Sequence, residues 1–443
     1  MTLEGHILKL CFIEVQIMND TEEKKQAFEL RKMYALDLTS PLPVVIMLLL
    51  VASCFLFSAK EQSVHDKILR HRHIASFMST TNLTHRLAMR ARPNARIAVA
   101  FGIENSFTTA NSGVHHRFLQ RAVSIIKSVD QAAWMKVRDT AEHTLALMNL
   151  GQREAKVEPM VRILCFNVVL RLMTPAHEQL TVDIQEADWI TDTINWLWIE
   201  SKAQGKQDNI RQEAILLELR SRLKASTLDY DGDPLALIIP AYETLWRVVL
   251  LTYVHVAFRQ VDEETQPIIQ AALDSVLKDE EVQFDAKTTK FAAVSTELLS
   301  AEESHAKRVL LYQEALRLYP PTKRLYRASD DRSEAADIES LHHDARIWGP
   351  DALEFRPGRF AELTKDQRDA YIPFGAGRHT CPAANGFAGN MIVLLVAVLL
   401  KSVGSVKIGA HIVFEDEILD KDETACLPTG RSASRNWVVY PAA

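Results

Sequence analysis

The stretch "FGAGRHTCPA", residues 374–383, restricts the fold of this chain more than any other feature. Gly375 and Gly377 allow tight turns and the close approach of a large flat ligand, because glycine has no Cβ. Cys381 is one of five cysteines in 443 residues, and no two of them are spaced as C-x-x-C. A thiolate is a strong iron ligand, and backbone N–H groups turned toward its sulfur tune the iron. The loop therefore indicates an iron thiolate, with a buried structural cysteine in a glycine-rich turn as the alternative.

The spacing in this loop resembles the haem-binding signature of the cytochrome P450 superfamily. The signature positions are occupied by Phe374, Gly377, His379, Cys381 and Ala383. His379 stands where arginine is commoner, and Ala383 stands where glycine is commoner. The resemblance implies a bound haem b (iron protoporphyrin IX) with Cys381 as the metal ligand. It also implies that Phe374, Gly377 and His379 line the cofactor.

Two further stretches resemble the same superfamily in the same order along the chain. "EALRLYPP" places Glu314 and Arg317 three residues apart, on one face of a helix, and "FRPGRF" supplies Arg359. The resemblance implies that Glu314 is held between the two arginines, a structural role suited to the guanidinium fork. It also implies that Arg327 binds a haem propionate.

A long apolar stretch, "LIIPAYETLWRVVLLTYV", resembles the superfamily helix that crosses the haem face. Glu243 and Thr244 match its acid and alcohol, which implies that they relay protons to bound dioxygen. Pro240 and Ala241 depart from the usual pattern. A proline inside a helix frees the carbonyl four residues earlier, that of Ala236, so we expect a local opening for dioxygen and a water at this point.

The residues on an early helix that would bind the second propionate are left open by the sequence. "WMKVR" gives Trp134 and Arg138 in the superfamily's Trp-x-x-x-Arg spacing. "VHHRFLQR" also resembles the start of that helix, with Arg121 as the donor. A core position is the alternative for Trp134.

The remaining pattern predicts a mainly α fold with a minor β component. Apolar residues recur at three-and-four spacing from about 115 to 320, whereas prolines, glycines and short β-rich patches follow. The resemblance implies the cytochrome P450 fold, a helical haem-binding domain with a small β-rich lobe. The expected divisions are an N-terminal extension, a transmembrane anchor, a linker or remnant of the N-terminal lobe, and the haem domain: 1–37, 38–59, 60–99 and 100–443.

One charge-free segment, 38–59, is long enough to span a bilayer, which needs about 20 apolar residues. It predicts a single-pass membrane protein, and the resemblance implies the endoplasmic reticulum with the catalytic domain facing the cytosol. In that orientation only Asn19, and not Asn82, is open to glycosylation. The front of the chain is atypical, because too few residues follow the anchor to form the usual N-terminal strands and the two helices that come after them. The second apolar run, 391–400, is too short to span and predicts a core helix.

The function implied by the resemblance is that of a haem-thiolate monooxygenase. It would use O2 and an apolar small-molecule substrate, with electrons from a separate NADPH-cytochrome P450 reductase, since no glycine motif for flavin or nicotinamide is visible. The loop and the "PPTKRLYR" run look like fungal members, which commonly oxidise terpenoids and other secondary metabolites. A net charge of −6 gives no indication of nucleic-acid binding. The alternatives are a haem-thiolate isomerase or dehydratase without a reductase, or a truncated inactive relative.

Overall fold

The computed structural model describes residues 63–77, 80–150, 153–173, 182–202, 209–226, 232–277, 296–329 and 332–442. Nearly all of them belong to the second of two compact units, Val64–Ala443. The expected extension 1–37 and membrane anchor 38–59 therefore lie outside the described residues, as does Asn19.

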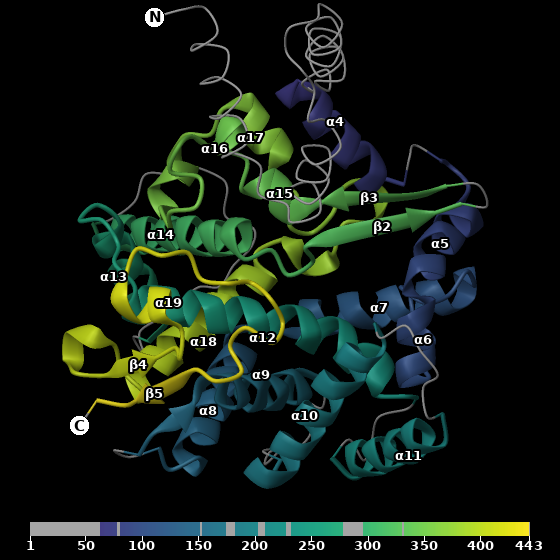
Figure 1. Ribbon diagram of the computed structural model, residues 1–443, viewed down its shortest axis with the longest axis horizontal. Coiled ribbons are helices and arrows are strands. Elements are labelled where there is room, and N and C mark those ends of the chain that lie inside the picture. The colour runs from purple at the N-terminus through teal and green to yellow at the C-terminus, as the bar shows by residue number, and fades with distance from the viewer. Residues whose placement is uncertain are drawn as a thin grey trace, which may run out of the picture. The chain divides into compact units, whose positions relative to one another are not determined.

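Two apolar helices form the centre of this unit, α12 (Leu235–Phe258) and α18 (Phe387–Ser402). They pack against each other; α12 also packs on α9 (Val157–Met173), and α18 on α14 (Thr296–Leu318) and α8 (Gln131–Leu147) (Figure 1). Helix α18 is apolar on every side, and a helix of that kind is stable in water only when it is buried all round. The prediction of a core helix after the cysteine loop is confirmed.

The other helices surround this centre, and several begin at a residue whose side chain accepts the first free backbone N–H groups. Asn111, Asp130 and Asp183 cap α7, α8 and α10 in this way. The mainly helical character expected for 115–320 is confirmed. These helices are α7 (Ser112–Ser128), α10 (Ile184–Glu200), α11 (Asn209–Ser226), α13 (Thr265–Leu277), α15 (Ile338–His342), α16 (Ala345–Trp348), α17 (Lys365–Ala370) and α19 (Glu417–Lys421).

Within the described ranges, two stretches are long and apolar enough to cross a membrane, Leu235–Phe258 and Phe387–Ile408. The most apolar window of the first is 67% buried in the protein, and that of the second is 61% buried. Burial of this extent is what a core helix requires, so both stretches are explained by the packing of this unit.

The β component consists of two small antiparallel sheets. Strands β1 (Ala155–Lys156), β5 (Val438–Tyr440) and β4 (His411–Val413) form the first, in which Val439 pairs with both neighbours and is fully buried. The second is the hairpin of β2 (Arg324–Ala328) and β3 (Ser333–Asp337). The minor strands expected in the C-terminal tail are thus confirmed.

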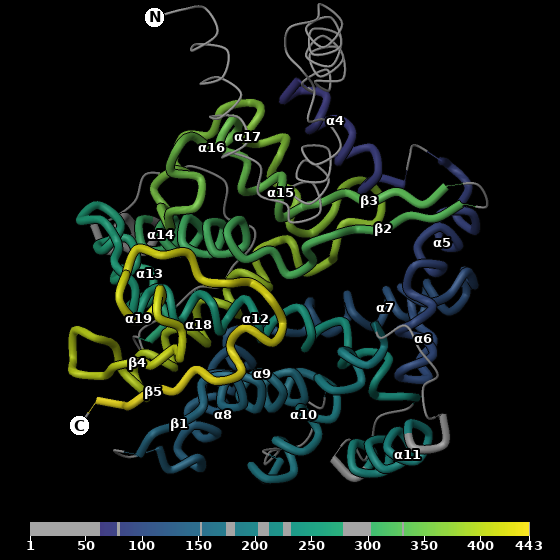
Figure 2. The backbone as a smooth tube through the Cα atoms, viewed as in Figure 1, coloured from purple at the N-terminus to yellow at the C-terminus, as the bar shows by residue number. Residues whose placement is uncertain are grey.

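The segment before residue 100, expected as a linker or remnant, is folded from residue 64 onward. Helices α4 (Val64–Ala75) and α5 (Leu83–Ala91) pack on the β2–β3 hairpin, and α6 (Ala95–Phe101) follows (Figure 2). Ile68 and Ile74 of α4 belong to a buried cluster that includes Trp348. The compact unit therefore begins well before the expected boundary, because α4 supplies apolar side chains to this second core.

Gly389 is required for the close contact between α18 and α14. A Cβ at this position would lie 2.4 Å from Cδ1 of Tyr312, far inside normal contact distance. We expect Gly389→Ala to lower the free energy of unfolding by about 1–3 kcal/mol, as overpacking of a filled core does. Chemical denaturation measures the change. Adding Tyr312→Leu should recover part of the loss, and a Gly389→Ala protein as stable as the wild type contradicts the packing described.

Candidate functional site

Cys381 lies at the end of a tight loop that its own backbone holds closed. Its N–H donates to the carbonyl oxygen of Phe374 at 3.1 Å, and its carbonyl accepts the N–H of Ala384 at 3.1 Å. Gly375 and Gly377 have φ angles of 77° and 74°, in the left-handed region that residues with a Cβ rarely adopt. The turn that presents the cysteine therefore depends on both glycines.

The thiol of Cys381 is accessible, whereas that of Cys165 is fully buried in the core. Desolvation by the surrounding protein raises the pKa of the Cys381 thiol, and a hydrogen bond from the backbone N–H of Ala383 acts in the opposite direction. An accessible sulfur that accepts a backbone N–H is suited to bind and tune a metal ion. A purely structural cysteine would be expected to resemble Cys165.

Beside the loop lie five basic or imidazole side chains, here named the arginine–histidine cluster: Arg86, Arg90, His115, Arg327 and His379. They come from α5, α7, β2 and the cysteine loop. Arg86 donates from Nε to Nε2 of His379 at 3.0 Å, and the rings of His115 and His379 are 5.2 Å apart. Nη2 of Arg90 lies 3.4 Å from Nδ1 of His115. Four separate segments of the chain thus converge on one point.

The cluster carries positive charge without a carboxylate partner. Burial lowers the pKa of Arg90 to about 9 and that of Arg327 to about 10, so both are charged at neutral pH. Each has a buried Nε without a hydrogen-bond partner, and the ring of Phe77 lies under both guanidinium groups, 4.0 Å from that of Arg327. In the part of the chain that the structure describes, no cluster member bonds to a carboxylate. Buried cations of this kind favour an anionic ligand.

The two histidines of the cluster are neutral at ordinary pH. Burial lowers the pKa of His379 to about 3 and that of His115 to about 4, and the nearby arginines add to this effect by repulsion. Neutral imidazoles act here as hydrogen-bonding groups, so the positive charge resides on the arginines.

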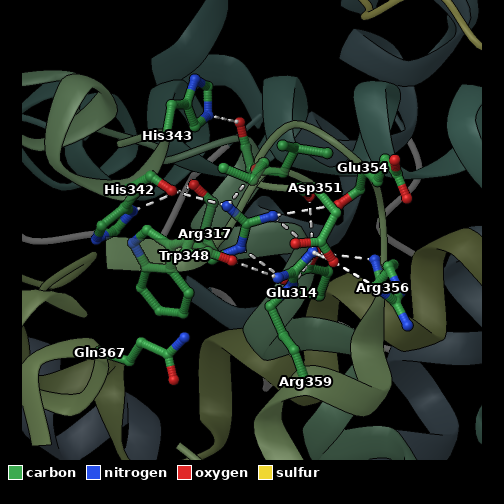
Figure 3. A network of polar contacts seen from close by, with 12 residues as sticks. Glu314, Arg317, His342, His343, Trp348, Asp351, Glu354, Arg356, Arg359 and Gln367 are labelled. Carbon is green, nitrogen blue, oxygen red and sulfur yellow. Dashed lines mark hydrogen bonds and ion pairs between the residues drawn. The ribbon is translucent and has the colours of Figure 1, made fainter. Parts of the chain in front are cut away.

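Behind the loop, Glu314 and Arg317 form a fully buried ion pair near the end of α14 (Figure 3). Arg317 donates to both carboxylate oxygens, at 2.7 and 2.8 Å. Arg359 donates to the same carboxylate at 3.1 Å from another part of the chain, and the backbone N–H of Arg356 does so at 2.9 Å. The glutamate is therefore held between two arginines, in the geometry that the sequence suggests.

This pair also fastens the irregular segment after α16. Arg317 donates to the carbonyl oxygens of His342 and Ala352, each at 2.7 Å, while Arg359 donates to those of Trp348 and Asp351. These bonds satisfy the carbonyl groups of the last residues of α15 and α16 and of the irregular segment that follows, as buried polar groups require. The network thus fixes the stretch that leads toward the cysteine loop.

On α12, Glu243 and Thr244 point in different directions. Glu243 is buried and forms an ion pair with Arg431, and its Oε1 has no hydrogen-bond partner. Thr244 is exposed, and its hydroxyl donates to the carbonyl oxygen of Pro240 at 2.8 Å. No hydrogen bond that the structure gives to either side chain joins Glu243 to Thr244.

The opening expected at the proline of α12 is occupied by a side chain. Pro240 has no N–H, so the carbonyl of Ala236 is freed as predicted. The side-chain amide of the buried Asn105 donates to that carbonyl at 2.8 Å. A residue from the loop after α6 thus already uses this carbonyl, and the expected dioxygen and water site stays a prediction.

The three other propionate candidates lie elsewhere on the early helices. Trp134 is 4% exposed and packs on Phe387 at 5.5 Å between ring centroids, as a core residue does. Arg138 is on the same helix, with Nε 3.9 Å from a carboxylate oxygen of Asp139. Arg121 is partly buried on α7. It is His115 of α7, and not Arg121, that the structure brings to His379.

Comparison with known proteins relates part of the chain to one protein family. Residues 311–402 match the sequence model of the cytochrome P450 family. Cytochrome P450 72A397 of Kalopanax septemlobus is 38% identical over 115 residues, covering 22% of this chain and 22% of that protein. Cytochrome P450 71A18 of Arabidopsis thaliana is 49% identical over 59 residues, covering 13% and 12%. The sequence match thus covers less than a quarter of either relative, and the family-model match contains the cysteine loop.

The solved structures extend the similarity to most of the described chain. A six-coordinated cytochrome P450 from Thermus thermophilus superposes with a TM-score of 0.50 over 82% of this chain and 91% of its own, at 12% identity. The haem domain of a cytochrome P450DA mutant gives 0.50 over 85% and 90%, at 13% identity. The chain has the cytochrome P450 fold. At such identities this similarity concerns the fold alone.

The side chains fit the haem that the cytochrome P450 fold implies. Cys381 offers an accessible sulfur to the iron, and the arginine–histidine cluster offers unpaired positive charge of the kind that two propionates would neutralise. The unpartnered Nε atoms of Arg90 and Arg327 are the strongest single indication. Buried donors of this kind cost free energy unless a ligand satisfies them.

Sequence reasoning missed Arg86, Arg90 and His115. Arg86 and Arg90 are four residues apart on α5, which places them on one face of the helix. That spacing alone does not distinguish a buried site from a solvated face. His115 stands next to His116 in a stretch that does resemble the superfamily. Only the contact of its ring with His379 shows that His115, and not His116, belongs to the cluster.

Proposed function

We propose that the protein is a haem-thiolate monooxygenase that inserts oxygen into an apolar small molecule. The observation that carries this proposal is the accessible Cys381 in its glycine loop beside an unpaired cationic cluster. When bound, the haem would supply the redox-active iron at which O2 is activated. The chain itself would supply the sulfur ligand, the propionate partners and the protons.

We assign the binding of haem b to particular groups. The Cys381 thiolate would ligate the iron, with Phe374 and Gly377 shaping the loop around it. The propionates would be neutralised by the cluster, principally by Arg90 and Arg327, in preference to Trp134, Arg138 and Arg121. Glu314, Arg317 and Arg359 would hold the segment behind the loop.

Proton delivery is assigned to α12. The Thr244 hydroxyl is accessible and donates its proton to the Pro240 carbonyl, and rotation of the hydroxyl would redirect that proton toward a molecule on the same face. Glu243 would take up and pass on protons through its unpartnered Oε1, while Arg431 holds the other carboxylate oxygen in place. The Glu243 side chain would have to move to pass a proton to the Thr244 hydroxyl.

Removal of the hydroxyl tests this assignment. We expect Thr244→Ala to lower the product formed per NADPH consumed by about tenfold or more, since general acid catalysis is lost while electron input continues. Thr244→Ser should restore most of the yield. Product and NADPH are measured together, and an unchanged ratio in Thr244→Ala excludes the relay.

The partners and location follow from the same proposal. Electrons would come from a separate NADPH-cytochrome P450 reductase. Residues 38–59 would anchor the chain in the endoplasmic reticulum membrane, with the catalytic unit in the cytosol.

The fungal-type loop suggests a terpenoid or other secondary metabolite as substrate. In the described unit, Asn82 caps α5, because its side chain accepts the backbone N–H of His85 at 2.9 Å. A side chain used in this way is consistent with an asparagine that carries no glycan.

A carbon monoxide difference spectrum of the reduced, purified protein tests the central proposal. A thiolate-ligated haem gives a red-shifted band, and its absence would remove the enzymatic assignment. Turnover should also require NADPH and the reductase. Turnover without either would instead identify an isomerase or dehydratase.

A further inference from the structure

One stripe of α12 is not covered by the core. Ala241 and Thr244 are exposed and Arg247 is partly so, while Tyr242, Glu243 and other residues of the helix are buried. Positions three apart share one face of a helix, so the side chains of Thr244 and Arg247 extend from the same face of α12. Any molecule positioned next to the Thr244 hydroxyl therefore lies within one helical turn of a guanidinium group.

Two further arginines lie near this stripe. Arg431 belongs to the C-terminal segment, which passes over α12 between α19 and β5 (Figure 2), and its guanidinium lies 4.8 Å from the ring of Trp198 and 5.8 Å from that of Trp246. Arg96 of α6 lies over the same Trp198 ring at 5.3 Å. Arg431 and Arg96 thus both lie over the partly exposed ring of Trp198, and the ring of Trp246 beside Arg431 is buried.

The carboxylates near this group do not neutralise it. Glu243 is committed to Arg431, and Glu339 is paired with Lys323 at 2.9 Å. Among the residues that the structure describes, Arg247 has no ion pair, and its bond is to the backbone carbonyl of Thr429 at 3.4 Å.

The pKa shifts of the cations in this patch indicate that they repel one another. Burial is the largest cause that lowers the pKa of Arg96, of Arg247 and of Lys202, and the charge of Arg431 is the next in each case. Arg96 and Arg247 both act on Lys202 in the same direction. Glu243 and Glu339 act on Arg247 in the opposite direction, but they are paired with Arg431 and Lys323. Arg96, Arg247 and Lys202 therefore keep a surplus of positive charge in a partly desolvated setting, where an anion binds more strongly than in water.

The patch is distinct from the arginine–histidine cluster. Tyr326 of β2 acts electrostatically on Arg96, and its neighbour Arg327 belongs to the cluster. The two groups have no member in common.

We propose that the substrate is an apolar molecule with a carboxylate group, which Arg247 binds with the help of Arg96, while Trp198 contacts its apolar part. This inference rests on the proposed monooxygenase function and deepens it. The unpaired guanidinium of Arg247 would form a charge-assisted pair with the carboxylate. The substrate would thereby be oriented with its hydrocarbon along the accessible stripe.

Equilibrium dialysis with the full-length purified protein tests the proposal without relying on turnover. The probes are dodecanoate and abietate, each compared with its own methyl ester, so that only the charge differs. We expect at least one acid to bind more tightly than its ester. Arg247→Gln should reduce that preference by about tenfold to one hundredfold, the loss of one hydrogen bond to a charged group, and Arg96→Gln should reduce it less.

Arg435→Gln is the matched control, because Arg435 is an exposed arginine of the same C-terminal segment. It should leave the preference for the acid unchanged. Equal binding of each acid and its ester overturns the proposal, and so does a preference that survives in Arg247→Gln and Arg96→Gln combined. The carbon monoxide spectrum of the same preparation separates the two hypotheses. A normal thiolate band without acid preference rejects only the substrate class, whereas acid preference without the band rejects only the monooxygenase.

Discussion

Replacing Cys381 with serine is expected to abolish the red-shifted carbon monoxide band and all measurable turnover. A serine hydroxyl is not deprotonated at neutral pH and offers oxygen in place of a soft thiolate, so the electron donation that defines this type of iron site is lost. The loop itself should persist, because its closure relies on the backbone of Phe374 and on Gly375 and Gly377. Difference spectroscopy of the purified variant measures the outcome.

Cys426→Ser provides the control, since Cys426 is another accessible cysteine far along the chain. Its spectrum and turnover should equal those of the wild type. If Cys381→Ser kept the band while Cys426→Ser lost it, the metal ligand would have been assigned to the wrong sulfur. If neither variant changed, the haem-thiolate assignment would be wrong altogether.

Glu314→Ala is expected to lower the free energy of unfolding by about 3–5 kcal/mol, the usual cost of breaking a buried ion pair. The substitution leaves the fully buried Arg317 without its carboxylate and removes one partner of Arg359. An uncompensated charge would then remain where water cannot reach it. We expect thermal unfolding well below that of the wild type and poor recovery of haem-bound protein.

Glu303→Ala is the comparison on the same helix. Glu303 pairs with Lys307 on an exposed face of α14, with 66% of its side chain accessible. Solvent screens such a pair, so no measurable change in stability is expected. Equal effects of the two substitutions would show that the Glu314 network contributes no more than a surface ion pair.

The sequence predicts this network well because its members occur in short, ordered stretches. Glu314 and Arg317 share a helix face by spacing alone, and the stretch holding Arg359 has its own local pattern. The same holds for the Cys381 loop, where glycines at fixed offsets specify a turn. The apolar run of α18 likewise indicates a core helix, since its composition leaves no polar face.

Other features depend on contacts that no local pattern encodes. Arg86, Arg90 and His115 reach the cluster only because α5 and α7 pack beside β2 and the cysteine loop. The use of Asn105 to satisfy Ala236 is similar, since the two positions are 131 residues apart. A proline in a helix predicts a freed carbonyl, but it does not predict which donor will bond to that carbonyl.

The pairing of Glu243 with Arg431 joins positions 188 residues apart. During synthesis α12 therefore leaves the ribosome long before its partner exists, and the carboxylate must stay hydrated or protonated until the later segment docks. The central helix can settle into its final environment only in one of the last folding steps. Nascent chains halted before residue 431 should accordingly be more readily cleaved by proteases around α12 than the released protein.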